Sequence, residues 1–135
     1  MRILGIDYGD KNIGLAVSDK MLITAQPLKS YKARSKREDA QFFKNLILKH
    51  KITKIVIGLP LRMNGSEGTR VQRTKKFAAW LKNTLNIPIV YWDERLTTKQ
   101  ASQIMRERGL SHKKKKELVD QISAVIILSS YLDSM

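Results

Sequence analysis

Short apolar runs separated by glycine and asparagine open the chain, a pattern that is typical of β-strands joined by tight turns. Arg2–Asp7 and Ile13–Ser18 each predict a strand, and residues 8–12 between them suit a hairpin turn. A third strand is expected around Ile23–Tyr31. Because Pro27 has no amide hydrogen to donate to a central ladder, this strand should lie at a sheet edge or contain an irregularity.

From Ser35 onward, the spacing of apolar residues changes to the period of a helix. One helical face carries Ala40, Phe43, Leu46 and Ile47, and a second helix carries Val71, Thr74, Ala78, Leu81 and Leu85. The run Lys54–Leu59, which Pro60 ends, predicts a buried parallel strand between these helices. A further apolar strand is expected at Ile87–Trp92.

Two more helices are expected toward the carboxyl end. Thr97 or Thr98 can cap a helix that runs to about Arg108. The last helix, from Glu117 to about Leu132, has apolar residues around much of its circumference, so it should be well buried.

The expected elements follow the order three strands, helix, strand, helix, strand, helix, helix. This order predicts an α/β fold: an antiparallel meander of the first three strands, then strand–helix–strand crossovers, giving a mixed β-sheet with helices on its faces. The chain of 135 residues has the size of one domain and shows no internal repeat or linker. We therefore expect residues 1–135 to form a single domain.

The composition bounds the setting in which the protein works. No cysteine is present, which excludes disulfides and thiolate metal ligands. The longest apolar stretch, Ala124–Leu128, is far too short to cross a bilayer, and Arg2 leads directly into a strand-like pattern rather than an apolar signal segment. We expect a cytoplasmic protein with no membrane partner.

The strong positive charge favours a nucleic-acid partner. The chain has 26 lysines and arginines against 12 acidic residues, a formal net charge of +14, and its pI is about 10.2. Neutralising phosphates releases condensed counterions, which supplies affinity without base readout. For any single lysine, a solvated surface position is the alternative interpretation. The candidate nucleic-acid-binding residues are Lys11, Arg34, Lys36, Arg37, Arg70, Arg95, Lys113, Lys114, Lys115 and Lys116.

Three acidic residues stand out in this basic chain because of where they occur. Asp7 ends the first strand, Glu94 follows the last strand, and Asp120 lies near the start of the final helix. If the two strands are central neighbours and the helix crosses their ends, the carboxylates can converge. Like charges at close range disfavour each other, and a divalent cation removes that cost. The pattern predicts an all-oxygen catalytic site for Mg²⁺ or Mn²⁺, suited to phosphodiester cleavage.

Each acid also has a structural interpretation. Asp7 could accept backbone hydrogen bonds in the turn, and Asp120 could be stabilised by the dipole at the helix N-terminus. Glu94 could pair with Arg95, which could instead position a phosphate. Asp93 is a weaker catalytic candidate than Glu94, because strand alternation sends neighbouring side chains to opposite faces.

Other residues near these acids suggest substrate contacts. Arg70 and the free amides at the start of the second helix could bind phosphate, with residues 62–68 as a connecting loop. Trp80 and Trp92 could stack on exposed bases. Their places within a helix pattern and a strand pattern favour core packing instead.

The segments that carry the acids resemble one known family. The resemblance to the YqgF/RuvX family of RNase H-like proteins rests on four motifs in order: GIDYGDKNIGLAVSD, GLPLRMNGSEGTR, YWDERLTT and VDQISAVIILSSYLD. It covers nearly the whole chain, and the expected acidic positions are all present. The resemblance implies a ribonuclease H-like fold with Asp7, Glu94 and Asp120 as the acidic site.

Proteins of this family are described as nucleases that process the 5′ end of precursor 16S rRNA and as Holliday-junction resolvases. The resemblance therefore implies a metal-dependent phosphodiester hydrolase. We favour processing of structured RNA in ribosome biogenesis, which leaves open whether a ribosomal partner takes part. The resolvase alternative needs branched DNA and a homodimer, because paired cuts across a junction call for two-fold symmetry.

Two other classes of function remain alternatives. In one, the protein is a non-catalytic nucleic-acid-binding module whose acids only organise turns. In the other, the Asp-x-Gly motif at Asp7 belongs to an ATPase related to sugar kinases and actin, although such proteins close two domains around nucleotide and this chain has room for one.

Overall fold

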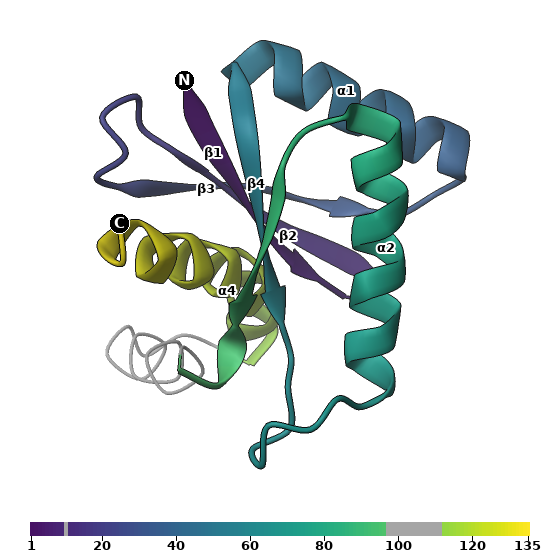
Figure 1. Ribbon diagram of the computed structural model, residues 1–135, viewed down its shortest axis with the longest axis vertical. Coiled ribbons are helices and arrows are strands. Elements are labelled where there is room, and N and C mark those ends of the chain that lie inside the picture. The colour runs from purple at the N-terminus through teal and green to yellow at the C-terminus, as the bar shows by residue number, and fades with distance from the viewer. Residues whose placement is uncertain (10, 97–111) are drawn as a thin grey trace.

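The computed structural model describes residues 1–9, 11–96 and 112–135, and it describes the helix at residues 112–121 without side chains. A five-stranded sheet with strand order β3-β2-β1-β4-β5 forms the centre of the molecule (Figure 1). The strands are β1 (Arg2–Tyr8), β2 (Asn12–Ser18), β3 (Ala25–Lys32), β4 (Ile52–Leu59) and β5 (Ile89–Asp93). The helices are α1 (Lys36–His50), α2 (Thr69–Leu85), a short 3₁₀ turn (Glu94–Leu96) and α4 (His112–Asp133).

The sheet is mixed, as the sequence predicts. β1 and β2 pair antiparallel, as do β2 and β3, whereas β4 runs parallel to both β1 and β5. β3 lies at the edge of the sheet, which confirms the position expected from Pro27. The predicted meander followed by strand–helix–strand crossovers is therefore confirmed.

Helices cover both faces of the sheet, and each face has its own apolar core (Figure 1). On the face covered by α1 and α2, Leu4 and Ile6 of β1 are completely buried in the same cluster as Phe43 of α1. On the other face, Ile3 of β1 is buried in a cluster with Ile127 and other residues of α4. Successive residues of β1 thus serve opposite layers, as strand alternation requires.

The helix termini follow ordinary capping rules. The side chain of Ser35 accepts a hydrogen bond from the amide of Glu38 at 3.1 Å and caps α1. The left-handed residue Lys51 ends this helix and donates its amide to Ile47. None of the described helices combines the length and the continuous apolar sequence that crossing a bilayer requires.

Two expectations about the carboxyl-terminal part need comment. α4 begins at His112 rather than at Glu117, so the run Lys113–Lys116 belongs to the helix instead of preceding it. Lysine has a good helix propensity, so a run of four lysines can continue a helix even though it carries no apolar period. The helix expected from Thr97 or Thr98 to Arg108 lies outside the described residues.

Candidate active site

Asp7 lies near the carboxyl end of β1, at the centre of the sheet. Strand alternation places it on the same face as Ile3 and Gly5, the face that α4 covers. At Gly5, a Cβ would lie 2.7 Å from the Cβ of Leu128, so the helix backbone approaches the strand very closely. Asp7 therefore stands where β1 emerges from beneath α4.

Glu94 follows β5 immediately and starts the 3₁₀ turn. Its side chain lies against β4, because a Cβ at Gly58 would be 2.8 Å from the Cγ of Glu94 and 2.4 Å from the Cδ1 of Ile127. No residue larger than glycine fits there without movement of the glutamate or of α4. The glycine in β4 thus leaves room for Glu94 to reach across to the end of β1.

The two carboxyl groups meet. Glu94 and Asp7 share a side-chain hydrogen bond, which requires a proton on one of them. Burial, followed by the charge and the hydrogen bond of Asp7, raises the pKa of Glu94 to about 8, and the cation of Arg70 opposes this rise. The structure thus brings together two of the three acids singled out in the sequence.

The neighbouring acid, Asp93, has a different partner. Its carboxylate accepts hydrogen bonds from the guanidinium of Arg95 at 2.7, 2.9 and 3.1 Å and from the Arg95 amide at 2.9 Å. These bonds, with the side-chain bonds as the largest cause, lower the pKa of Asp93. Arg95 therefore pairs with Asp93 rather than with Glu94.

Asp120 lies on α4, and its side chain is outside the described part of the helix. The direction of the helix is defined by two contacts with β4. The hydroxyl of Tyr131 accepts a hydrogen bond from Lys54 near the start of the strand, whereas Ile127 packs at Gly58 near its end. α4 is therefore antiparallel to β4, and the turns before Ile127 continue toward the strand ends.

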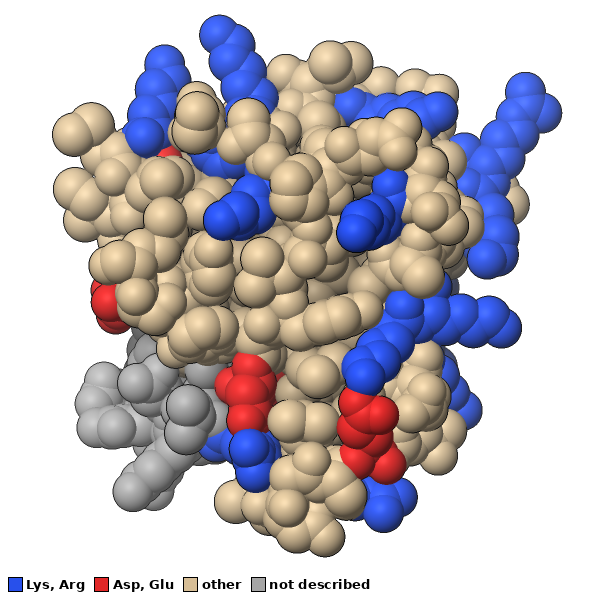
Figure 2. Space-filling view, viewed as in Figure 1, with Lys and Arg blue, Asp and Glu red and all other residues tan. Residues whose placement is uncertain are grey.

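The predicted nucleic-acid-binding residues are distributed around the site. Figure 2 shows lysine and arginine side chains projecting from the α1 and α2 side of the molecule. Lys11, Arg34, Lys36, Arg37, Arg70 and Arg95 are exposed. Lys113–Lys116 lie on α4 with side chains outside the described residues.

A small basic pocket lies beside the carboxyl end of β1. It has a volume of about 150 Å³ and is lined by Tyr8, Gly9, Arg70, Arg73 and Thr74. Arg70 also acts electrostatically on Glu94, so the pocket adjoins the acids. The sequence analysis missed Arg73, although it stands one helical turn after Arg70, a spacing that places both on one side of α2.

The two tryptophans occupy different environments. Trp92 donates its indole hydrogen to the hydroxyl of Ser130 at 3.0 Å and packs edge-on against Tyr131, 5.6 Å between ring centroids. Its predicted role in core packing is confirmed. Trp80 packs against the core on the α1 and α2 face but is only partly buried and also lines a pocket.

The mixed five-stranded sheet with helices on both faces defines a class of protein by its fold, the ribonuclease H-like fold. Two solved structures share this fold over 99% of the chain. They are the Thermus thermophilus RuvC in complex with a Holliday junction substrate, with a TM-score of 0.60, 14% identity and 94% of that chain covered, and the fowlpox virus Holliday junction resolvase, with a TM-score of 0.55, 13% identity and 99% of that chain covered.

The chain belongs to the RuvX family, described as "Holliday junction resolvase", whose sequence profile matches residues 1–134. It is 43% identical over 135 residues to a protein of Syntrophus aciditrophicus, covering 100% of this chain and 90% of the relative. It is 44% identical to a protein of Clostridium acetobutylicum, covering 100% of both chains. Both relatives carry the name "Putative pre-16S rRNA nuclease".

Proposed function

We propose that this protein is a divalent-metal-dependent endonuclease that cleaves precursor 16S rRNA near its 5′ end. The observation that carries the proposal is the contact between the carboxyl groups of Asp7 and Glu94, two partly buried acids in a chain with a net charge of +14. The curated relatives are named as pre-16S rRNA nucleases, which supports precursor 16S rRNA as the substrate.

The acids suit a divalent cation such as Mg²⁺ or Mn²⁺. In the absence of a cation, one proton has to be retained between Asp7 and Glu94, which is reflected in the raised pKa of Glu94. Among the side chains that the structure describes, which do not include those of residues 112–121, no group of three His, Cys, Asp or Glu residues could hold a metal ion. We propose Asp120 as the third ligand, because the first turns of α4 extend toward the ends of the central strands.

Asp7 and Glu94 would hold a divalent cation, which would supply a water molecule of lowered pKa and neutralise charge on the scissile phosphate. The side chains of the protein position the substrate and the ligands. Asp7 and Glu94 provide carboxylate oxygens from rigid positions at the ends of β1 and β5, and Arg70 holds a phosphate beside them. The exposed lysines and arginines bind the remaining backbone without reading its bases.

The direct test uses purified protein and an RNA that spans the mature 5′ end of 16S rRNA. Wild-type protein with Mg²⁺ or Mn²⁺ should cut this RNA, whereas Asp7→Asn should bind it without cutting. Mn²⁺ should also raise the melting temperature of the wild-type protein more than that of Asp7→Asn, because a ligand stabilises only the state that binds it.

A matched control is available one residue from Glu94. Asp93→Asn makes the same chemical change at a neighbouring carboxylate that pairs with Arg95 instead, so it should retain cleavage within a few-fold of wild type. Full cleavage by Asp7→Asn would overturn the assignment of the acids. Salt-sensitive binding without cleavage of any structured RNA or DNA would favour the non-catalytic binding module.

Resolution of Holliday junctions is the second candidate, favoured by the family description and by the fold. Paired, symmetric cuts in a four-way DNA junction by a homodimer would support it. A monomer that cuts the RNA and leaves the junction intact would exclude it. Cleavage of the rRNA only within a precursor ribosomal particle would show that a ribosomal partner is required.

A further inference from the structure

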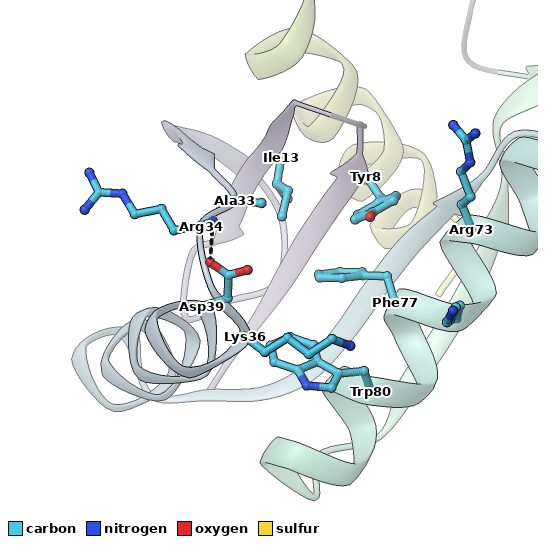
Figure 3. Close-up of a pocket in the computed structure, with 10 residues that line it drawn as sticks. Tyr8, Ile13, Ala33, Arg34, Lys36, Asp39, Arg73, Phe77 and Trp80 are labelled. Carbon is cyan, nitrogen blue, oxygen red and sulfur yellow. Dashed lines mark hydrogen bonds between the residues drawn. The ribbon is translucent and has the colours of Figure 1, made fainter.

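A pocket of about 320 Å³ opens between α1, α2 and the ends of β1 and β2 (Figure 3). This volume is at the lower end of the range for small-molecule sites and suits a ligand the size of one nucleoside. The pocket lies on the α1 and α2 face of the sheet, whereas the paired acids lie on the α4 face. It is therefore a separate cavity from the acidic site.

Three aromatic rings form one wall of this pocket. Tyr8 stacks on Phe77 with 4.5 Å between ring centroids and an angle of 25° between planes, and Phe77 lies 5.9 Å from Trp80. In Figure 3 the ring of Phe77 points toward the centre of the pocket, with Trp80 below it. All three side chains are partly buried, so the wall is held in place by the core and yet reaches solvent.

Cations surround the same opening. Arg34, Lys36, Arg73 and Lys76 line the pocket, and Figure 3 shows Arg34 and Arg73 extending outward from opposite sides. The ammonium of Lys36 lies 5.6 Å from the centroid of the Trp80 ring, so this cation covers one face of the indole, and a base that stacks there would have to displace the flexible lysine side chain.

Among the described residues that line the pocket, Asp39 is the one acid, and its carboxylate is held by hydrogen bonds. Asp39 accepts hydrogen bonds at one oxygen from the hydroxyl of Tyr31, at 2.6 Å, and from the amide of Arg34, at 2.9 Å. These bonds tie the end of β3 to α1 and fix this side of the pocket. Arg34 also pairs with Glu38, at 3.6 Å, while Lys36, Arg73 and Lys76 place further cationic side chains at the opening.

The pocket adjoins the small basic pocket described above, which lies between it and the acidic site. Tyr8 and Arg73 line both cavities, and Tyr8 is the next residue in the chain after Asp7. From the acids, a path therefore leads past Arg70 and Arg73 to the aromatic wall. Along this path the arginines, which can bind phosphates, come before the aromatic rings, which can stack on bases.

We propose that this aromatic pocket binds one unstacked base of the nucleic-acid strand, with its flanking phosphates held by Arg73 and Arg34. The proposal rests on the proposed nuclease function and adds a subsite to it. An aromatic wall provides a surface for the flat face of any base, while arginines at the rim match the phosphates on either side of it. The substrate strand must therefore be single-stranded, or locally opened, at this position.

The experiment compares two probes of equal length and charge in EDTA, so that no cleavage occurs. One probe is a fluorescein-labelled RNA of eight nucleotides, and the other is a chain of eight stable abasic units. By fluorescence anisotropy, wild-type protein should bind the RNA about 10-fold more tightly, because stacking on an aromatic residue contributes this much or more. Trp80→Ala should lose this preference and Trp80→Phe should keep most of it.

A second variant tests the pocket without the loss of core packing that Trp80→Ala can cause. Ala33→Trp adds a side chain at an exposed wall position and should fill the pocket without removing any core atoms. Its affinity for the RNA should fall about 10-fold, with unchanged affinity for the abasic chain. Tyr91→Ala, which removes an exposed aromatic residue on β5 outside the pocket, should change neither affinity.

A spectroscopic measurement locates the base. In a Trp92→Phe background, Trp80 is the remaining tryptophan, and its emission should be quenched by the RNA but not by the abasic chain. Equal affinity for both probes, or a Trp80→Ala defect of equal size on both, would overturn the base subsite and leave the nuclease proposal intact. Failure of wild-type protein to bind either probe would also overturn the base subsite, whereas the nuclease proposal is decided by cleavage of the RNA that spans the mature 5′ end of 16S rRNA.

Discussion

Glu94 is buried against β4 and hydrogen-bonded to Asp7, and this position has a consequence for stability. Its pKa is raised from the ordinary value of 4.5 to about 8 in the folded protein. Between these pH values the carboxyl group is ionised in the unfolded chain but protonated in the folded one. Ionisation therefore favours unfolding, and this group lowers the free energy of unfolding as the pH rises.

The change Glu94→Gln should remove this penalty in the metal-free protein. At pH 8 in EDTA, the variant should be more stable than wild type by at least about 1 kcal/mol, since one pKa unit corresponds to about 1.4 kcal/mol. At pH 4 the two proteins should have nearly equal stability. Urea unfolding at both pH values measures the difference, and a variant less stable than wild type at pH 8 would contradict the raised pKa.

For individual residues, the sequence predicts where a side chain lies better than it predicts which group that side chain contacts. Asp7 and Glu94 could be placed together because both follow strand ends, and parallel strand ends lie at one edge of a sheet. The partner of Arg95 could not be predicted, because a short 3₁₀ turn decides whether its guanidinium reaches Asp93 or Glu94. Such a choice depends on side-chain geometry rather than on periodicity.

Among the structural elements, the contact between β4 and α4 positions the candidate site. A Cβ at position 58 would lie 2.4 Å from the Cδ1 of Ile127 and 2.8 Å from the Cγ of Glu94. Gly58→Ala should therefore destabilise the protein by about 1–3 kcal/mol, the usual cost of overpacking, and displace the glutamate. Chemical unfolding and the cleavage assay test these two effects separately.

A double variant distinguishes the two clashes at position 58. Ile127→Val removes the Cδ1 methyl group and alone should cost about 1 kcal/mol. Combined with Gly58→Ala, it should restore part of the lost stability, so that the double variant is more stable than additivity predicts. Cleavage should stay impaired, because the clash with Glu94 remains. Strict additivity would argue against the close contact.

The start of α1 offers a test of local structure alone. Ser35→Ala removes the side chain that accepts the amide of Glu38 and should cost about 1 kcal/mol, whereas Ser35→Asp should be nearly neutral because aspartate also caps helices. Thermal unfolding measures both. An alanine variant as stable as wild type would show that the cap contributes little.

Most elements were predictable, because apolar periodicity reports directly on burial. The strands of the meander, β4 and the apolar face of α2 all follow it. The first turn of α4 was missed, since four consecutive lysines carry no apolar period and their helix propensity was the only sequence evidence. The pocket beside α2 was missed for a different reason: its wall combines Tyr8 from one strand with side chains from two helices.

For the whole molecule, the excess of positive charge should make nucleic-acid binding steeply dependent on salt. Each phosphate contact contributes about 0.9 to the slope of log affinity against log salt concentration. Lys76→Ala, beside the aromatic pocket, should lower this slope by about 1. Lys49→Ala, in the last turn of α1 near the amino end of β1, should leave it unchanged. Equal effects of both variants would indicate binding without a preferred face.

The alternation of β1 between two cores also bears on how such a protein can evolve. Leu4 and Ile6 belong to the core on the α1 and α2 face, while Ile3 and Gly5 face α4. Mutations at even positions of this strand can remodel the side that surrounds the aromatic pocket, and mutations at odd positions can adjust the side that holds the acids. Substrate preference and chemistry can therefore drift separately within a strand of seven residues.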